Sequence, residues 1–126
     1  MSTTPEFARK TKVTVDASRG EIERLVSRYG AKRFGVIVDN EDHHAMVEFT
    51  IGRRRVRFEL PSAQKVSPQR ERARWRSLTM AIKAKLDAVH IGISTFEEEF
   101  LANIVMADGR RFGEITIPQL EYDSTS

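Results

Sequence analysis

The sequence predicts an α+β fold, in which helices cover one face of an antiparallel sheet. Two long segments, 18–29 and the one that begins at Pro68, carry apolar side chains at helical spacing. The three segments between them, 34–38, 45–51 and 56–60, alternate apolar and polar side chains as strands do. With 126 residues and a hydrophobic share of 40%, the chain is long enough for one packed core.

In chain order we expect a short strand, a helix, a three-stranded antiparallel meander, a long amphipathic helix, a short helix and a terminal hairpin. Lys12–Val15 alternates and is β-branched, which predicts the short strand. Ser18 and Glu21 fit a capping box, so the first helix is expected at 18–29. Gly30 follows it and can take the left-handed conformation that ends a helix.

The meander is expected to have one apolar face and one face that carries arginine. Polar Asn40–His44 separates the first two strands, and Gly52–Arg53 is a candidate for the tight turn between the second and third. Because side chains alternate along a strand, Arg55 and Arg57 lie on the face opposite the apolar residues.

The longest helix is expected to begin at Ser67, which caps it, and at Pro68, whose missing N–H costs nothing in the first turn. Its apolar stripe consists of Trp75, Leu78, Ile82, Leu86 and Val89. Gly92 ends it. We expect Trp75 to pack in the core and not to stack on bases, because it aligns with the apolar stripe.

The last part of the chain predicts a short helix followed by a hairpin. Ser94 and Thr95 are both capping candidates, and the acidic run Glu97–Glu99 occupies the first turn, where negative charge is favoured. Residues 104–106 fit either the end of this helix or a strand, and we favour the strand. It leads into a turn at Asp108–Gly109, with 112–117 returning.

One domain is expected at 11–118, between a flexible N-terminus at 1–10 and a flexible tail at 119–126. The chain contains no cysteine, which excludes disulfides and thiol chemistry. No run approaches the roughly 18 to 20 apolar residues of a membrane-spanning helix. We therefore expect a soluble, cytoplasmic protein with no membrane partner.

Positive and negative charges are unevenly distributed along the chain, whose net charge is +3. Residues 53–76 contain nine Lys or Arg against two acids, whereas residues 87–126 contain eight acids against two arginines. Such segregation steers a polyanion or an oppositely charged partner to one face. It would also let the basic segment of one chain pair with the acidic segment of another in a homodimer.

Eight arginines form the candidate binding site for nucleic acid or another polyanion. They are Arg53, Arg54, Arg55 and Arg57 of the third strand and its turn, and Arg70, Arg72, Arg74 and Arg76 of the long helix. Guanidinium groups in this number could contact successive phosphates without reading the base sequence. Two other interpretations stay open, namely charges that protect a sheet edge from aggregation and cations whose methylenes cover the core seam.

Enzyme chemistry is not expected, and neither is a cofactor. The chain has no glycine-rich phosphate loop and no Gly-x-Ser-x-Gly motif, and the helix start accounts for Glu97–Glu99. His43 and His44 lie close to Asp39, Glu41 and Asp42, but adjacent residues in a strand-like loop point apart. We therefore predict no metal site there.

The second half of the chain contains several segments that carry a family resemblance. They are Arg74–Leu78, Ile82–Leu86, Gly92–Leu101, Asp108–Arg110, Gly113–Glu114 and Pro118–Gln119. In them the chain resembles small proteins encoded by tailed bacteriophages and prophages, and the likeness extends loosely back to about Thr14. The resemblance implies a bacterial host cytoplasm and no functional residue.

The function predicted from the sequence is that of a small phage-type accessory protein, not an enzyme, that binds nucleic acid through its basic strand and helix. The alternative is a phage-type interaction protein that binds or inhibits a host defence protein, or that sequesters an anionic small molecule. The first prediction requires the strand arginines and the helix arginines to share one surface.

Overall fold

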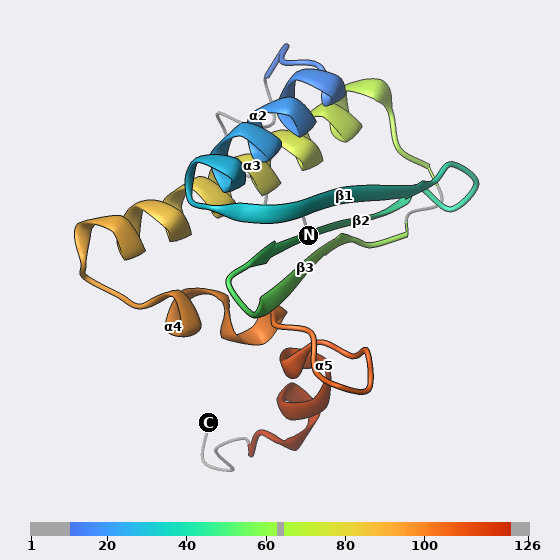
Figure 1. Cartoon of the computed structure of the whole chain (residues 1–126). Coiled ribbons are helices and arrows are strands. Elements are labelled where there is room, and N and C mark those ends of the chain that lie inside the picture. The colour runs from blue at the N-terminus through green and yellow to red at the C-terminus, as the bar shows by residue number, and fades with distance from the viewer. Residues whose placement is uncertain (1–10, 63–64, 122–126) are drawn as a thin grey trace.

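The structure, a computed structural model, describes residues 11–62 and 65–121 and confirms the α+β class (Figure 1). The long elements are α2 (Val15–Arg28), β1 (Ala31–Asp39), β2 (His44–Ile51), β3 (Arg54–Leu60) and α3 (Pro68–Ile91). Four short helices follow: α4 (Phe96–Phe100), η1 (Leu101–Asn103), α5 (Phe112–Thr116) and η2 (Ile117–Gln119). The flexible terminus predicted at 1–10 and most of the predicted tail, 122–126, lie outside the described residues.

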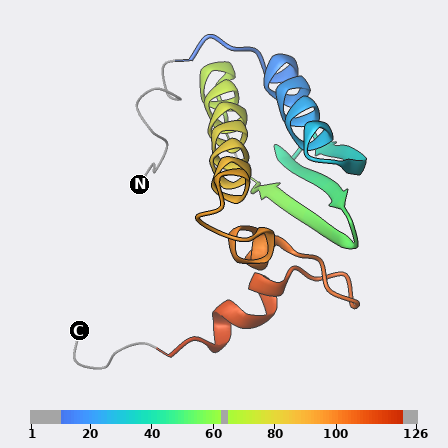
Figure 2. The same ribbon diagram turned by 60° about the vertical axis from the view of Figure 1, so that its left-hand side comes forward.

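The three strands form one antiparallel sheet in the order β1-β2-β3, as predicted. Helices α2 and α3 pack against each other on one side of this sheet (Figures 1 and 2). We call the covered side the helix face and the opposite side the open face. Between them lies the core, to which Phe49 of β2, Ile22 of α2 and Ile82 of α3 contribute side chains with at most 1% exposure.

Helix α2 begins earlier than the sequence predicts, and the prediction of a short strand at Lys12–Val15 is wrong. Thr14 is the N-cap of α2, because its hydroxyl accepts a hydrogen bond from Ala17 N at 3.1 Å. Alternation alone could not make a strand here, since a strand needs a neighbour to pair with. Ser18, the predicted cap, is instead fully buried inside the helix.

The long helix agrees with the sequence at both ends. Ser67 accepts a hydrogen bond from Arg70 N, and Gly92 ends the helix with φ of 92°. Trp75 is 3% exposed and lies in the core with Leu78, as the apolar stripe predicts. Because α3 packs on α2 and shares one core cluster with the strands, it organises the helix face.

The short helix α4 is confirmed, and Thr95 rather than Ser94 caps it. Its last residue, Phe100, is fully buried and stacks on Phe96 with ring centroids 4.7 Å apart. Phe100 also meets Phe58 edge-on, which anchors the C-terminal segment to the core beneath β3.

The predicted terminal hairpin is only half correct. The turn at Asp108–Gly109 exists, since Met106 N donates to Arg110 O at 2.8 Å. The returning strand at 112–117 is wrong, because Phe112–Thr116 is helix α5. Glu114 explains the helix, because its carboxylate accepts hydrogen bonds from the N–H and the guanidinium of Arg111 at the N-cap.

Among the described residues, no helix is both long enough and apolar enough to cross a membrane.

Candidate nucleic-acid interface

The open face of the sheet presents charged and polar side chains in rows that run across the strands. One row contains Arg33, Thr50 and Arg55, because the register places Thr50 of β2 between the other two. The next row contains Gly35, Glu48 and Arg57. The alternation predicted for Arg55 and Arg57 is therefore confirmed, and a third arginine, from β1, joins them.

Five cationic residues lie where β1 and β3 begin, and strand alternation places Arg54 on the helix face, opposite to Arg33 and Arg55. We call this group the basic sheet end, and it consists of Lys32, Arg33, Arg53, Arg54 and Arg55. The antiparallel register explains the grouping, since the start of β1 and the start of β3 both pair with the end of β2. At the usual strand spacing, the Cα atoms of residues 33 and 55 lie about 10 Å apart.

A shallow hollow of ≈ 350 Å³ opens on the sheet between Arg33 and Arg55. Gly35 helps to form it, because no side chain rises above the sheet at that position. Glu48 of the next row also lines the hollow. The rim of the hollow is therefore positive, and its wall carries one negative charge.

The carboxylate of Glu48 binds two guanidinium groups at once. Arg55 donates to both of its oxygens at 3.1 and 3.0 Å, and Arg57 Nε donates to Oε2 at 3.0 Å. Partial burial by itself would raise the pKa of Glu48. The hydrogen bonds and charges of Arg55 and Arg57 outweigh this effect, so the pKa lies below its ordinary value.

Members of the basic sheet end differ in how their charges are compensated. Arg54 pairs with Glu97 of α4 at 3.3 Å, and Arg55 pairs with Glu48. In the described part of the chain, Lys32, Arg33 and Arg53 have no carboxylate partner. Three cations are thus free to meet an external anion.

Arg57 has a different role from the residues at the rim. Only 14% of its side chain is exposed, and its Nη1 donates to Gly109 O at 3.0 Å. It therefore connects the open face to the C-terminal turn. We consider Arg57 a structural residue, although the sequence grouped it with the binding arginines.

The helix arginines do not join the strand arginines on one surface. Helix α3 covers the helix face, whereas Arg55 and Arg57 lie on the open face, and β3 runs away from Arg53 before the chain reaches α3 (Figure 1). Arg76 pairs with Glu21 of α2 at 2.8 Å. The convergence that the sequence interpretation required is not observed.

Two further helix arginines are engaged in structural contacts. Arg74 donates to Pro61 O at 2.7 Å and to His43 O at 3.2 Å, so it joins α3 to both loops at its end of the sheet. Arg72 donates to Gln69. Arg70 is exposed and has no carboxylate partner within 11–62 and 65–121, but it stands apart from the basic sheet end.

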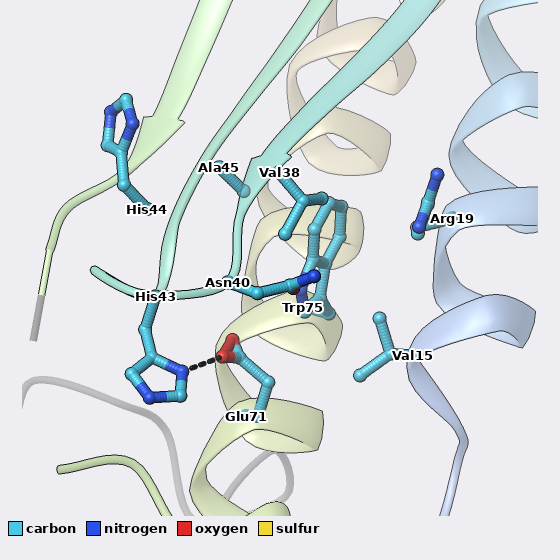
Figure 3. Close-up of a pocket in the computed structure, with 9 residues that line it drawn as sticks. All are labelled: Val15, Arg19, Val38, Asn40, His43, His44, Ala45, Glu71 and Trp75. Atoms are coloured by element: carbon cyan, nitrogen blue, oxygen red, sulfur yellow. Dashed lines mark ion pairs between the residues drawn. The ribbon is translucent and has the colours of Figure 1, made fainter.

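A second hollow lies at the other end of the sheet, between the β1–β2 loop and the two long helices (Figure 3). Trp75 lines it, and the guanidinium of Arg19 lies 5.8 Å from the centre of the tryptophan ring. His43 Nδ1 lies 3.9 Å from Glu71, whereas His44 points away and lies 3.8 Å from Glu59. The two histidines diverge, so they do not form a joint site.

No group of three or more His, Asp or Glu side chains that could hold a metal ion occurs among the described residues. The acidic run Glu97–Glu99 occupies the first turn of α4, as expected, and there Glu98 interacts with Thr95. These carboxylates have the helix-start role that the sequence assigns to them.

Sequence reasoning missed Lys32 and Arg33. The signal was present, because β1 alternates around Arg33, Gly35 and Ile37 just as β3 alternates around its arginines. What could not be read from the sequence was the register that brings the start of β1 to the start of β3.

Comparison of the chain with protein-family models, with curated proteins and with solved structures found no match.

Proposed function

We propose that the protein binds the sugar–phosphate backbone of nucleic acid through the basic sheet end, without reading the base sequence. The observation that carries the proposal is the uncompensated charge of Lys32, Arg33 and Arg53 on one rim of the sheet. Phosphates supply most of the binding energy in complexes of this kind, and guanidinium groups suit their geometry.

An extended polyanion fits this surface better than a small anion does. A small anion inside the hollow would lie close to the carboxylate of Glu48, which would repel it. A nucleic-acid backbone can instead follow the positive rim and contact several cations in turn. A host protein as partner, and the phage-type setting, stay predictions from the sequence.

Removal of the rim charges provides the direct test. The variant K32Q/R33Q/R53Q should bind labelled single- and double-stranded oligonucleotides about 10- to 100-fold more weakly at low salt. The plot of log affinity against log salt concentration should become shallower by about 2 to 3, one unit for each lost phosphate contact. Fluorescence anisotropy across a salt series measures both quantities.

The matched control removes three exposed cations from elsewhere. Lys12, Arg24 and Lys65 have no carboxylate partner in the described part of the chain, so K12Q/R24Q/K65Q changes the net charge equally. It should retain most of the affinity. An equal loss in both triple variants would contradict a localised site, and no binding by the natural chain at low salt would remove the proposal.

A gain of affinity offers a second test that misfolding cannot imitate. Glu48→Gln removes the carboxylate that occupies Arg55 and Arg57, and it should tighten oligonucleotide binding by about 3- to 10-fold. Glu23→Gln on the exposed surface of α2 makes the same change in net charge and should have little effect. Weaker binding by the Glu48 variant would contradict the proposed site.

A further inference from the structure

The two edges of the sheet are not equally covered. Beside β3, the chain adds one isolated bridge, in which Ile104 pairs with Val56, and Val105 N donates to Arg55 O at 2.8 Å. Beside β1, no other strand or bridge lies within the described residues. The nine residues of β1 therefore form a long edge whose outward main-chain groups can pair with another strand.

The hydrogen bonds of β3 reveal which main-chain groups face outward. Val105 N bonds to Arg55 O, and the side-chain amide of Asn103 bonds to Arg57 O at 3.0 Å. Both carbonyls therefore point away from β2. In an antiparallel strand the N–H and C=O of one residue point to the same side, and successive residues alternate.

The register carries this alternation across the sheet to β1. Val56 lies between Arg55 and Arg57, so it bonds to its β2 partner, Phe49. The next β2 residue, Glu48, therefore turns toward β1, where its partner is Gly35. Phe34, Val36 and Val38 must then direct their N–H and C=O groups away from the sheet. These three residues form the outer edge.

The middle of this edge lacks the usual protection against pairing. Residues 34–38 carry no charge, and Ile37 and Val38 expose 62% and 43% of their surface. Edge strands of monomeric proteins commonly place charges there. The charges of β1 lie only near its ends, with Lys32 and Arg33 at the start and Asp39 at the last position.

We propose that β1 pairs antiparallel with β1 of a second copy of this chain, so that two sheets join into one. The charges favour this partner, because antiparallel pairing places the basic start of each strand beside the acidic end of the other. A two-fold axis through Val36 matches the outward groups, since Val36 then bonds to its own copy and Phe34 bonds to Val38 of the other chain.

This register also fits the side chains on the open face. It places Arg33 opposite Asp39 of the second copy, and Ile37 opposite Gly35. Gly35 leaves room for the isoleucine, because nothing lies within 4 Å of the position that a Cβ would take there. The exposed apolar surface of Ile37 and Val38 is covered in the pair.

Cysteine cross-linking tests the register directly. The chain contains no cysteine, so the variant G35C/I37C introduces the only thiols. Residues 35 and 37 of opposite chains form a non-hydrogen-bonded pair, whose Cα separation of about 4.5 Å suits a disulfide. Mild oxidation should convert most of the protein to a covalent dimer, seen on non-reducing gels.

The single variant I37C is the control, since its thiol would lie opposite a glycine. It should form far less dimer than the double variant under the same conditions. Equal cross-linking of both variants would overturn the proposed register. Failure of the double variant to cross-link while its circular dichroism matches the natural chain would overturn the pairing itself.

The oligomeric state gives an independent readout. Light scattering should find dimers of the natural chain, and I37K/V38K should shift the population to monomer, because charges at an edge oppose pairing. The matched control I91K/I93K replaces two residues of α3 and its C-terminal turn that are 71% and 79% exposed, and it should stay dimeric. A natural chain that is monomeric at all concentrations would overturn the inference.

These experiments contain no nucleic acid, so their outcome is independent of the proposed function. The two surfaces meet at Arg33, which faces Asp39 of the second copy in the pair, so Lys32 and Arg53 are then the cations of each chain without a carboxylate partner in the described residues. Lys32 also belongs to β1, whereas the other three members of the basic sheet end, Arg53, Arg54 and Arg55, lie at β3 and its turn, away from the β1 edge.

Discussion

Glu48 is the residue on which the electrostatics of the open face depend. Its side chain is only 24% exposed, and its carboxylate holds Arg55 and Arg57 at hydrogen-bond distance. Like-charged guanidinium groups on alternate positions of one strand would otherwise repel each other. The shared carboxylate therefore allows two arginines to occupy the same face of β3.

Glu48→Gln should lower the free energy of unfolding by about 1 kcal/mol at pH 7. The pKa of Glu48 lies below its ordinary value, so its stabilising effect is present above the pKa of the unfolded chain. That effect is lost as the pH falls through the lower, folded-state pKa. The difference between the two proteins should shrink between about pH 5 and pH 3.

Urea unfolding across this pH range measures the difference. Glu23→Gln on α2 serves as the control, because Glu23 is exposed and has no cationic partner in the described residues. A difference for Glu48→Gln that stays constant down to pH 3 would show that the carboxylate's charge is not responsible.

Substitutions at two residues near the start of α2 distinguish the N-cap seen in the structure, Thr14, from the N-cap predicted from the sequence, Ser18. Thr14→Ala removes the capping hydroxyl that binds Ala17 N, and it should cost about 1 kcal/mol of stability. Ser18→Ala should be neutral or stabilising by up to about 1 kcal/mol. The Ser18 hydroxyl is buried without a hydrogen-bond partner among the described residues, so its removal relieves a desolvation cost.

Urea denaturation followed by helical circular dichroism compares these two variants. The capping box predicted from the sequence requires the opposite order, with Ser18→Ala as the more damaging change. That order of stabilities would contradict the assignment of Thr14 as the cap.

At the level of elements, the short helix α5 depends on a close approach between Gly113 and Ala102 of η1 that no local sequence pattern predicts. A Cβ at position 113 would lie 2.9 Å from Ala102 O and 3.1 Å from Ala102 Cβ. Only glycine lets α5 pack against η1 at this distance. The approach and the Glu114 cap together select a helix in a segment where apolar residues also fit a strand.

Gly113→Ala should destabilise the protein by about 1 to 3 kcal/mol, because the added methyl group meets backbone that cannot move easily. Gly20→Ala in α2 should instead stabilise it by up to about 1 kcal/mol. There the added group meets the flexible end of Arg24 at 3.3 Å. Thermal unfolding of the two variants measures the contrast, and stabilisation by both would contradict the close packing of α5.

The strands and long helices were predictable because each carries its own local pattern. Ser67, Pro68 and Gly92 mark the two ends of α3 through backbone requirements that do not depend on the rest of the fold. The strand at Lys12–Val15 failed because pairing depends on a neighbour elsewhere in the chain. Local alternation is necessary for a strand but does not supply that neighbour.

On the scale of the whole molecule, one core joins the sheet, both long helices and α4, whereas the arginine-bearing part of the open face stays polar. The layers divide the arginines between two sides of the sheet. Those of α3 hold helices and loops together, as Arg74 and Arg76 do, while Lys32, Arg33 and Arg53 remain available at the sheet end. Net charge along the chain is therefore a poor guide to charge at the surface.

The sequence by itself determined the fold class, the three strands, the long helix and the burial of Trp75, because periodicity and capping act over a few neighbouring residues. Only the tertiary structure decided which cations share a surface. Strand register joins Arg33 to Arg55 across β2, and the sheet keeps both apart from Arg76. Pairing between distant segments sets these distances, and no local pattern contains them.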